Sequence, residues 1–317
     1  MIGLWLEDGE LRLREDLGVP EAPSGEVLVR VLRAGICATD HGLVSGMYPF
    51  RGILGHEFVG VVDEGPDDLR GRRVVGEINA SCGRCERCVR GLGRHCATRT
   101  VLGIVNRHGA FAEYLTLPRE NLHIVPDNVS NEAAVYTEPL AAALEINEQL
   151  SIEPNDRVLV IGDGRLGQLI ARTLSLTSCD LVVSGRHERK LGLLSDRHIT
   201  TISPQEIEEG SYDYAVECTG NSAGFTDARR SLKPRGTLVL KSTYPGQPEI
   251  DATMIVVEEI TLVGSRCGPF APALRLLRAG HVDVSDLEDA SFPLRDGLKA
   301  FERSRERGTL KVTLSNE

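Results

Sequence analysis

The 317-residue sequence lacks three features that would point to a membrane, to secretion or to a polyanionic partner. No run of apolar residues is long enough to span a bilayer, and the N-terminus carries no signal-peptide pattern. Positive charge is in deficit, because 36 Lys and Arg stand against 46 Asp and Glu, a formal net charge of −10. Such a chain has little nonspecific attraction for nucleic acid or anionic lipid. We therefore expect a cytoplasmic protein that binds neither nucleic acid nor membrane.

Eight cysteines are present, and four of them crowd into one short loop with the spacing C-x2-C-x2-C-x7-C: Cys82, Cys85, Cys88 and Cys96. Without a secretion signal, this distribution favours metal binding in a reducing compartment over a disulfide framework. Four thiolates on a tight loop can close a tetrahedral shell around a structural zinc, which then supplies folding energy to its lobe. An iron–sulfur cluster also takes four Cys ligands and is the alternative.

A second candidate metal site combines two glycine-containing stretches. Cys37 lies in G-I-C-A-T-D, and His56 and Glu57 lie in L-G-H-E. A thiolate, an imidazole and a carboxylate are ligand types of a catalytic zinc, which keeps one position open for water or substrate. Glu138, at the start of an alanine-rich helix, is another carboxylate that could reach a metal. The alternatives are a buried Cys with a structural His, and a helix-start acid favoured by the helix dipole.

The first part of the chain has the pattern of short β-strands. Residues 26–33 alternate apolar and charged side chains, and further β runs follow at 58–62, 72–76 and 109–115. Alternation with a period of two is typical of half-buried strands. These segments predict a compact β-rich domain.

The pattern changes at residues 157–161, an uninterrupted apolar strand. The turn G-D-G-R-L-G follows at 162–167, then a helix at 168–176 and a strand at 181–183. A lone G-x-G-x-x-G is weak, but a preceding strand and a following helix are the context of a dinucleotide-binding fingerprint. Further strands at 212–217, 236–240 and 260–264 predict a doubly wound parallel sheet.

Residues that bind the cofactor are expected at one edge of this sheet. The turn and the strand end at 217 supply Gly162, Gly164, Arg165, Leu166, Gly167, Cys218, Thr219 and Gly220. An acidic residue at the tip of the second strand would hold the ribose 2′-hydroxyl of NAD. Ser184 and Arg186 stand there instead, and they could bind a 2′-phosphate. We expect NADP(H) in preference to NAD(H); the alternative is that Arg186 is solvated and NAD binds.

Five motifs follow one another along the chain: G-I-C-x-T-D, G-H-E, the four-Cys loop, E-P-L and G-x-G-x-x-G. In this order they make the chain resemble the zinc-dependent medium-chain dehydrogenase/reductase superfamily over nearly its whole length. The resemblance is greatest to the polyol, sorbitol and glucose dehydrogenase branch, because of Glu138. It implies an α/β protein with a GroES-like β-rich catalytic domain, residues 1–145 and 270–317, whose zinc lobe is 80–98. A Rossmann domain, residues 146–269, is inserted into it. A homodimer or homotetramer is also implied.

The resemblance implies roles for individual residues and two zinc ions per chain. These are Cys37, His56 and either Glu57 or Glu138 as catalytic-zinc ligands, Thr39 as the proton-relay hydroxyl, and His41 as a relay imidazole. His41 follows Cys37 by four residues where many relatives have five, which leaves its role open.

The implied activity is hydride transfer between a small secondary alcohol, such as a polyol or sugar, and nicotinamide. Two other readings stand beside it. One is an amino-alcohol dehydrogenase of the threonine type, and the other is a non-catalytic NADPH-binding or redox-sensing protein.

Overall fold

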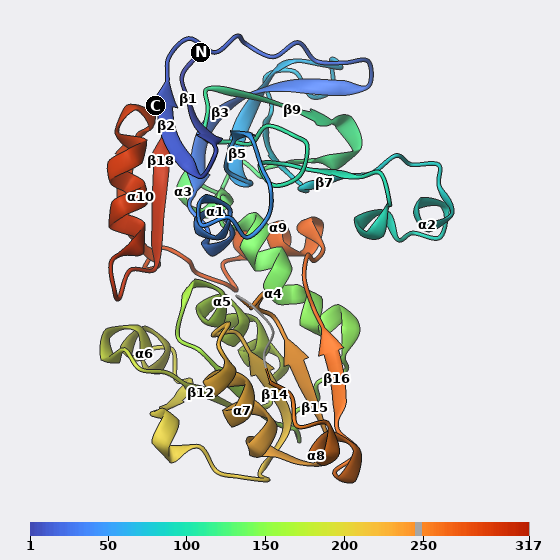
Figure 1. Ribbon diagram of the computed structural model, residues 1–317, viewed down its shortest axis with the longest axis vertical. Coiled ribbons are helices and arrows are strands. Elements are labelled where there is room, and N and C mark those ends of the chain that lie inside the picture. Colours follow the sequence, from blue (N-terminus) through green and yellow to red (C-terminus); the bar gives the residue numbers. More distant parts are fainter. Residues whose placement is uncertain (245–248, 317) are drawn as a thin grey trace. The chain divides into compact units, whose positions relative to one another are not determined.

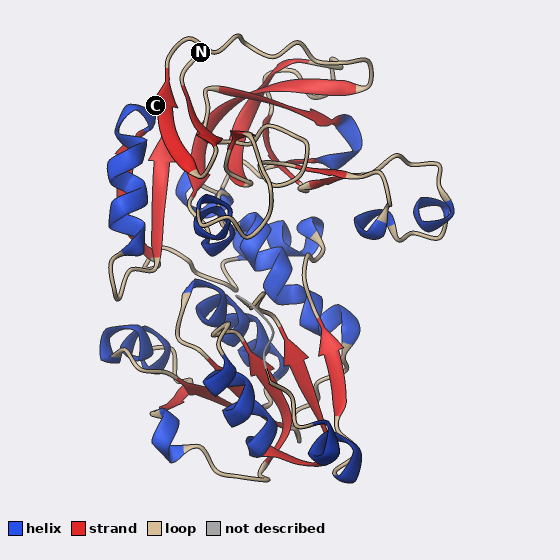
Figure 2. Ribbon diagram, viewed as in Figure 1, coloured by secondary structure: helices blue, strands red, loops and turns tan. Residues whose placement is uncertain are grey.

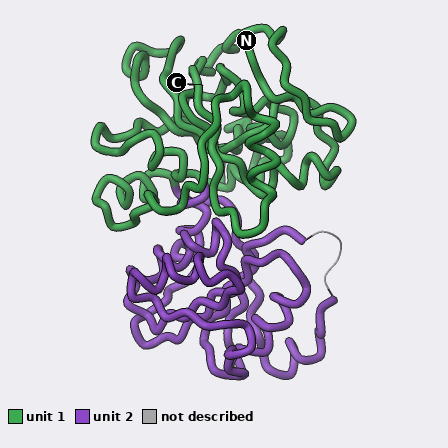
Figure 3. Tube along the Cα trace, turned by 90° about the vertical axis from the view of Figure 1, so that its left-hand side faces the viewer, with its two compact units in different colours: residues 1–138, 270–317 green, residues 139–269 purple. Residues whose placement is uncertain are grey.

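The computed structural model describes residues 1–244 and 249–316, which form two units (Figure 3). Unit 1 comprises Met1–Glu138 and Phe270–Glu317, and unit 2 comprises Pro139–Pro269. The first boundary falls within a helix, after Glu138, whereas the sequence led us to expect it after residue 145. Pro139 does not interrupt that helix, because a proline in the first turn lacks only an N–H that has no helical partner there.

Unit 1 is rich in strands (Figure 2). They are β1 (Gly3–Glu7), β2 (Glu10–Arg14), β3 (Glu26–Gly35), β4 (Gly52–Ile53), β5 (Glu57–Glu64), β6 (Arg73–Gly76), β7 (Asn79–Ala80), β8 (Thr100–Val101), β9 (Tyr114–Pro118), β10 (Leu122–Ile124), β17 (Glu288–Pro293) and β18 (Lys311–Ser315). A seven-stranded sheet has the order β10-β6-β5-β3-β18-β17, with β9 also paired to β3. Smaller sheets are β2-β1-β4 and β7-β8.

The helices of unit 1 lie between and after these strands. They are α1 (Ala38–Val44), α2 (Glu86–Val89), α3 (Asn131–Ala134), the start of α4 (Thr137–Gln149), α9 (Phe270–Ala279) and α10 (Gly297–Arg305), with short 3₁₀ turns at Gly93–His95, Arg119–Asn121 and Leu294–Asp296. Helix α10 packs against β17 and β18. Across the described residues, no helix has the length and apolar character needed to cross a bilayer.

Strand β3 is the centre of unit 1, and the far end of the chain joins it there. Strand β18 pairs antiparallel with β3, and β17 pairs parallel with β18. Arg33 in β3 is buried and donates to Glu288 at 2.9 Å, to Thr313 at 3.1 Å and to Glu132 at 2.9 Å. These bonds connect β3 to β17, to β18 and to α3.

One expected strand of unit 1 is shorter than the sequence suggested. We expected strand character from 109 to 115, but β9 begins only at Tyr114. Residues 109–111 instead form backbone hydrogen bonds with the loop at 53–55, at 2.7–2.8 Å. A β-like run of apolar residues is therefore used here to hold a loop.

Unit 2 is a parallel sheet with helices (Figure 1). Its elements are β11 (Arg157–Ile161), α5 (Arg165–Leu174), β12 (Asp180–Ser184), α6 (Glu188–Ser195), β13 (Thr200–Ile202), β14 (Tyr212–Glu217), α7 (Ser222–Ser231), β15 (Leu232–Leu240), α8 (Ala252–Val257) and β16 (Thr261–Gly264), with 3₁₀ turns at Ser175–Thr177 and Pro204–Glu206. The sheet order is β13-β12-β11-β14-β15-β16, and every pair is parallel.

This order confirms the predicted doubly wound sheet. Chain order reverses between β11 and β14, and in such sheets ligands bind at the carboxyl ends of the strands beside that switch point. The core is apolar and includes Leu159, Ala215 and Leu238, none of which is accessible to solvent. Helix α5 begins at Arg165 rather than at the expected residue 168, because the glycine-rich turn leads directly into the first helical turn.

Candidate metal and cofactor sites

Three of the four predicted catalytic-zinc ligands lie together in unit 1. Cys37 precedes α1, His56 ends the loop before β5, and Glu57 is the first residue of β5. One ligand atom from each lies within 4.8 Å of the others. His56 and Glu57 are 3% and 1% exposed. Among the described residues this group does not include Glu138.

The loop before His56 depends on glycine. Gly55 has φ +96°, a conformation that side chains disfavour. A Cβ on Gly109 would lie 2.2 Å from the Gly55 carbonyl oxygen, and the Ala110 N–H donates to the same oxygen at 2.8 Å. The G-H-E motif is thus shaped by a second segment that crosses it closely.

Behind His56 lies Asp40, a carboxylate that sequence reasoning missed. It is fully buried, its Oδ1 lies 3.2 Å from His56 Nδ1, and its Oδ2 accepts the Cys37 N–H at 2.8 Å. Burial alone would lower the pKa of His56, but the Asp40 carboxylate and the Cys37 thiol outweigh it and raise that pKa well above its usual value. A carboxylate on Nδ1 fixes the tautomer and leaves Nε2 for a metal. The available signal was an acid at the third position of a helix that follows a Cys.

Glu57 is held by a buried cation that sequence reasoning also missed. Lys311 in β18 is 2% exposed, and its Nζ forms an ion pair with Oε2 of Glu57. The same Nζ lies 5.8 Å from the centre of the Tyr136 ring. Nothing in the K-V-T-L sequence of β18 signals this role, because the partners are 254 positions apart.

The two predicted relay residues have different surroundings. Thr39 Oγ1 lies 3.8 Å from Cys37 Sγ, at the metal group. His41 instead faces α10: its Nε2 lies 2.9 Å from Ser304 Oγ, and Arg305 Nε donates to its Nδ1 at 3.2 Å. The Ser304 hydroxyl donates to a backbone carbonyl, so His41 Nε2 is the donor to Ser304. Both ring nitrogens of His41 are therefore engaged with α10.

The four-Cys loop forms the second metal-binding geometry, around α2 (Figure 1). The Sγ atoms of Cys82, Cys85, Cys88 and Cys96 lie 3.4–3.9 Å from one another in the contacts that link them. A zinc–sulfur bond of about 2.3 Å places the sulfurs of a tetrahedron roughly 3.8 Å apart. Backbone and Thr98 hydrogen bonds lower the pKa of Cys96 to about 5, whereas burial and the neighbouring thiols raise the pKa of Cys88 to about 11. Without a metal, the loop therefore favours a thiolate at Cys96 and a thiol at Cys88. The loop therefore fits one tetrahedral ion.

The glycine-rich turn of unit 2 is tightly packed against itself. Gly162 has φ +123°, and a Cβ on Gly167 would lie 2.0 Å from the Gly162 carbonyl oxygen. Gly164 is the N-cap of α5, and Arg165 and Leu166 form its first turn. The helix N-terminus at the end of β11 presents N–H groups suited to a pyrophosphate.

The strand end at β14 is organised by a buried acid. Glu217 accepts from the backbone N–H groups of Thr219 at 2.6 Å and Gly220 at 3.0 Å, and from the Tyr244 hydroxyl. Burial raises the pKa of the Cys218 thiol, which donates to the Ile161 carbonyl at 3.1 Å. The C-T-G segment is thus fixed by internal bonds.

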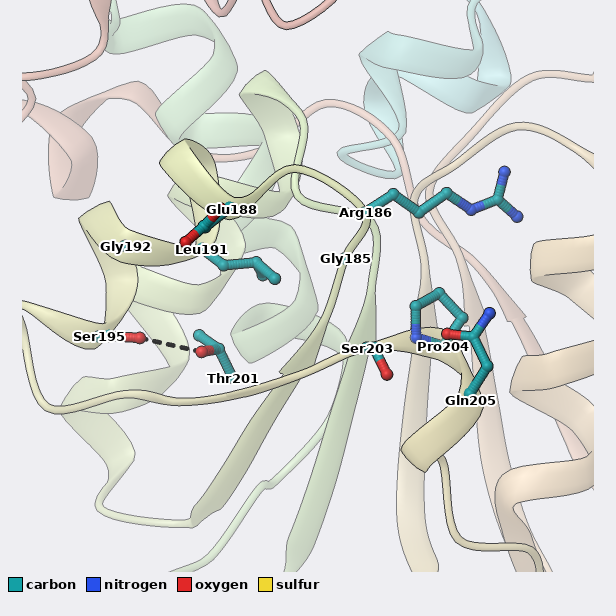
Figure 4. Close-up of a pocket in the computed structure, with 10 residues that line it drawn as sticks. All are labelled: Gly185, Arg186, Glu188, Leu191, Gly192, Ser195, Thr201, Ser203, Pro204 and Gln205. Carbon is teal, nitrogen blue, oxygen red and sulfur yellow. Dashed lines mark hydrogen bonds between the residues drawn. The ribbon is translucent and has the colours of Figure 1, made fainter.

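At the tip of β12 the two residues expected to bind a 2′-phosphate differ in exposure. Ser184 is 1% exposed, its hydroxyl has no partner among the described residues, and it does not line the cavity that Arg186 lines. Arg186 is exposed and lines a cavity of about 660 Å³. Ser203 and Gln205, which follow β13, line the same cavity (Figure 4). Ser203 therefore shares this cavity with Arg186, whereas the Ser184 side chain is buried.

The comparisons with known proteins agree with this geometry. The model of the alcohol dehydrogenase GroES-like domain matches residues 23–127. L-threonine 3-dehydrogenase of Chelativorans sp. strain BNC1 is 31% identical, over 83% of this chain and 80% of that protein. Sorbitol dehydrogenase of Halalkalibacterium halodurans is 28% identical, over 93% of this chain and 94% of that protein. A structure described as a zinc-binding dehydrogenase from Sinorhizobium meliloti 1021 bound to NADP superposes with TM-score 0.90 at 27% identity, over 99% of this chain and 98% of that one.

Proposed function

This chain belongs to the zinc-dependent medium-chain dehydrogenase/reductase superfamily and is an oxidoreductase of the alcohol dehydrogenase type, and from that premise we propose that it oxidises a secondary alcohol with NADP or reduces the corresponding carbonyl with NADPH. The observation that carries the proposal is the convergence of Cys37, His56 and Glu57. Polyols and sugars are the proposed substrates. The non-catalytic reading is disfavoured, because a full set of ligand types is present.

The residues of this group fit a catalytic zinc. They offer one thiolate, one imidazole and one carboxylate, and Asp40 lies behind the imidazole as an outer partner. We assign the carboxylate position to Glu57 rather than Glu138. A zinc bound there would act as a Lewis acid that lowers the pKa of the alcohol hydroxyl.

The protein groups around the metal position have separate proposed tasks. Asp40 keeps the proton on His56 Nδ1, so that Nε2 stays a ligand. Lys311 neutralises one oxygen of Glu57 and leaves the other for the metal. Thr39 accepts and passes on the alcohol proton, because its hydroxyl is at the metal group.

His41 is left out of the proposed relay. To take up a proton it would have to release Arg305 from Nδ1, since Nε2 already donates to Ser304. We assign it instead to holding α10 against the end of α1.

The proposed preference for NADP(H) rests on Arg186. It lies at the cavity beyond the tip of β12, where an NAD enzyme would carry an acid for the ribose hydroxyl. A charge-assisted bond from a guanidinium to phosphate contributes about 1.5–3 kcal/mol, or roughly 10–150-fold in affinity. Replacing Arg186 by Gln should weaken NADPH binding by that order and leave NADH binding nearly unchanged, as read by the change in NAD(P)H fluorescence. A wild-type chain that binds NADH tenfold more tightly than NADPH would contradict this preference.

The metal assignment is tested by counting zinc. We expect two zinc ions per wild-type chain, one at the catalytic group and one at the four-Cys loop. Replacing Cys37 by Ser should leave one, abolish turnover and preserve NADPH binding. Full activity of that variant without its second metal ion would refute the assignment.

The substrate is tested with a panel of secondary alcohols, polyols and aldoses. L-Threonine belongs on the panel as the second candidate, because a curated relative that is 31% identical is an L-threonine 3-dehydrogenase.

We also propose a cytoplasmic homodimer or homotetramer. Its support is the edge strand β16 and the exposed side chains of the preceding α8, where Val256 and Val257 are 75% and 68% exposed; light scattering would give the assembly mass.

A further inference from the structure

One carboxylate in the glycine-rich turn has no part in the chemistry proposed above. Asp163 lies between Gly162 and Gly164, and only 6% of its surface is exposed. Its Oδ2 accepts the backbone N–H of Arg186 at 2.7 Å and that of His187 at 2.8 Å. Both carboxylate oxygens also lie 3.0 Å from His187 Nδ1. The side chain therefore joins the turn after β11 to the loop after β12.

The two loops are shaped to fit each other at this point. A Cβ on Gly185 would lie 2.6 Å from both Cβ and Oδ2 of Asp163, so the loop after β12 needs glycine to approach the carboxylate. His187 is the N-cap of α6, and its own side chain makes no capping bond. Asp163 thus supplies the acceptor for N–H groups at this helix start that would otherwise lack one.

The loop held in this way carries the residue that the cofactor preference rests on. Gly185, Arg186 and Glu188 form one side of the 660 Å³ cavity, and Ser203 and Gln205 belong to the opposite loop. Figure 4 shows the Arg186 side chain extending from the loop on the side of Pro204 and Gln205. The direction of that side chain depends on its backbone, which Asp163 fixes through the Arg186 N–H.

We propose that Asp163 is a positioning residue that selects for the 2′-phosphate of NADP(H) indirectly, by holding the loop from which Arg186 reaches it. The inference rests on the proposed NADP(H) preference. Asp163 does not touch the phosphate in this scheme, because its oxygens are taken up by two backbone N–H groups and one imidazole. The N–H groups and the imidazole also offset its negative charge, which would otherwise oppose a phosphate nearby.

Two substitutions distinguish the loss of the Asp163 acceptor oxygens from a change in side-chain volume. Asp163→Leu removes both oxygens at similar size. Asp163→Asn keeps one oxygen, which can accept both backbone N–H groups, while its amide can donate to a neutral His187 with Nδ1 unprotonated. We expect D163L to weaken NADPH binding about tenfold while NADH binding changes by less than about threefold. D163N should stay within about threefold of the wild type for both cofactors.

A second measurement reads the loop without any cofactor. Hydrogen exchange of the Arg186 and His187 amides, and tryptic cleavage after Arg186, should be faster in D163L than in the wild type and slow again in D163N. Equal losses for NADPH and NADH in D163L would overturn the inference, because they indicate general damage to unit 2. An unchanged NADPH-to-NADH ratio would overturn it too, whether or not the loop exchanges faster.

A different result would contradict the proposed NADP(H) preference itself. In that case the wild-type chain itself would lack a preference for NADPH, and Arg186→Gln would be silent. Failure of the present inference alone leaves a wild-type chain that prefers NADPH and a D163L chain that keeps the preference.

Discussion

Replacing Lys311 by Met tests whether the carboxylate of the proposed metal site depends on a buried cation. Lys311 and Glu57 are 2% and 1% exposed, and they form an ion pair with each other. Met matches the length of the lysine stem but removes its charge, so Glu57 would be left buried without its partner. Removing one member of a buried pair costs about 3–5 kcal/mol, because the remaining charge is uncompensated.

The double variant Lys311→Met with Glu57→Gln separates this cause from packing. Without a buried charge, its loss of stability should be well below that of the single variant. For a unit of this size, about 3–5 kcal/mol corresponds to a fall of roughly 6–20 °C in Tm. The measurement is thermal unfolding of metal-free protein, with Lys299→Met as the control, because Lys299 forms a surface pair with Asp296.

Zinc gives this prediction a second test. A bound cation would compensate Glu57 in place of Lys311, so the Tm deficit of Lys311→Met should shrink when zinc is restored. Equal deficits in the single and double variants, or a deficit that zinc does not change, would refute the reasoning.

Three further predictions concern other parts of unit 1. Replacing Asp40 by Asn should reduce zinc affinity at the catalytic group about 10–100-fold, as measured by competition with a chelator; unchanged affinity would mean that Asp40 does not orient His56. Replacing Cys96 by Ala should lower Tm and solubility before it lowers turnover per folded molecule, and an unchanged Tm would count against a structural zinc. His108 accepts the Ile53 N–H at 3.3 Å, and burial lowers its pKa. The imidazole of His108 therefore takes up a proton at higher pH in the unfolded chain than in the folded chain. Its contribution to stability is consequently lost as the pH falls below about 6.5. The difference in Tm between wild type and His108→Gln should change between pH 7.5 and 5, and a constant difference would exclude this linkage.

The sequence predicts those features that depend on short local motifs. Cys37, His56 and Glu57 were predicted as one metal group because each is a ligand type within two residues of a glycine, and the structure brings them within reach of one another. The parallel sheet was likewise predicted, because buried strands, glycine turn and helix follow each other locally. That these residues bind zinc and a nucleotide stays a prediction for the experiments above.

The residues that sequence reasoning missed act across long separations or through side-chain direction. Lys311 meets Glu57 from the other end of the chain, and no local pattern marks a lysine as buried. Ser184 was assigned to the 2′-phosphate because it stands at the tip of β12, two residues before Arg186, but its side chain is buried in the structure. Asp163 stood inside the glycine motif and was read as part of the turn, since its partners belong to the next loop.

The insertion of unit 2 into unit 1 also sets an order for synthesis. Residues 139–269 leave the ribosome as one uninterrupted stretch, so the parallel sheet can form while the chain is still growing. The seven-stranded sheet must wait, because β18, the neighbour of β3, is translated only after the whole of unit 2. Glu57 therefore has no Lys311 to pair with until unit 2 has been translated, and the centre of unit 1 stays open at least that long.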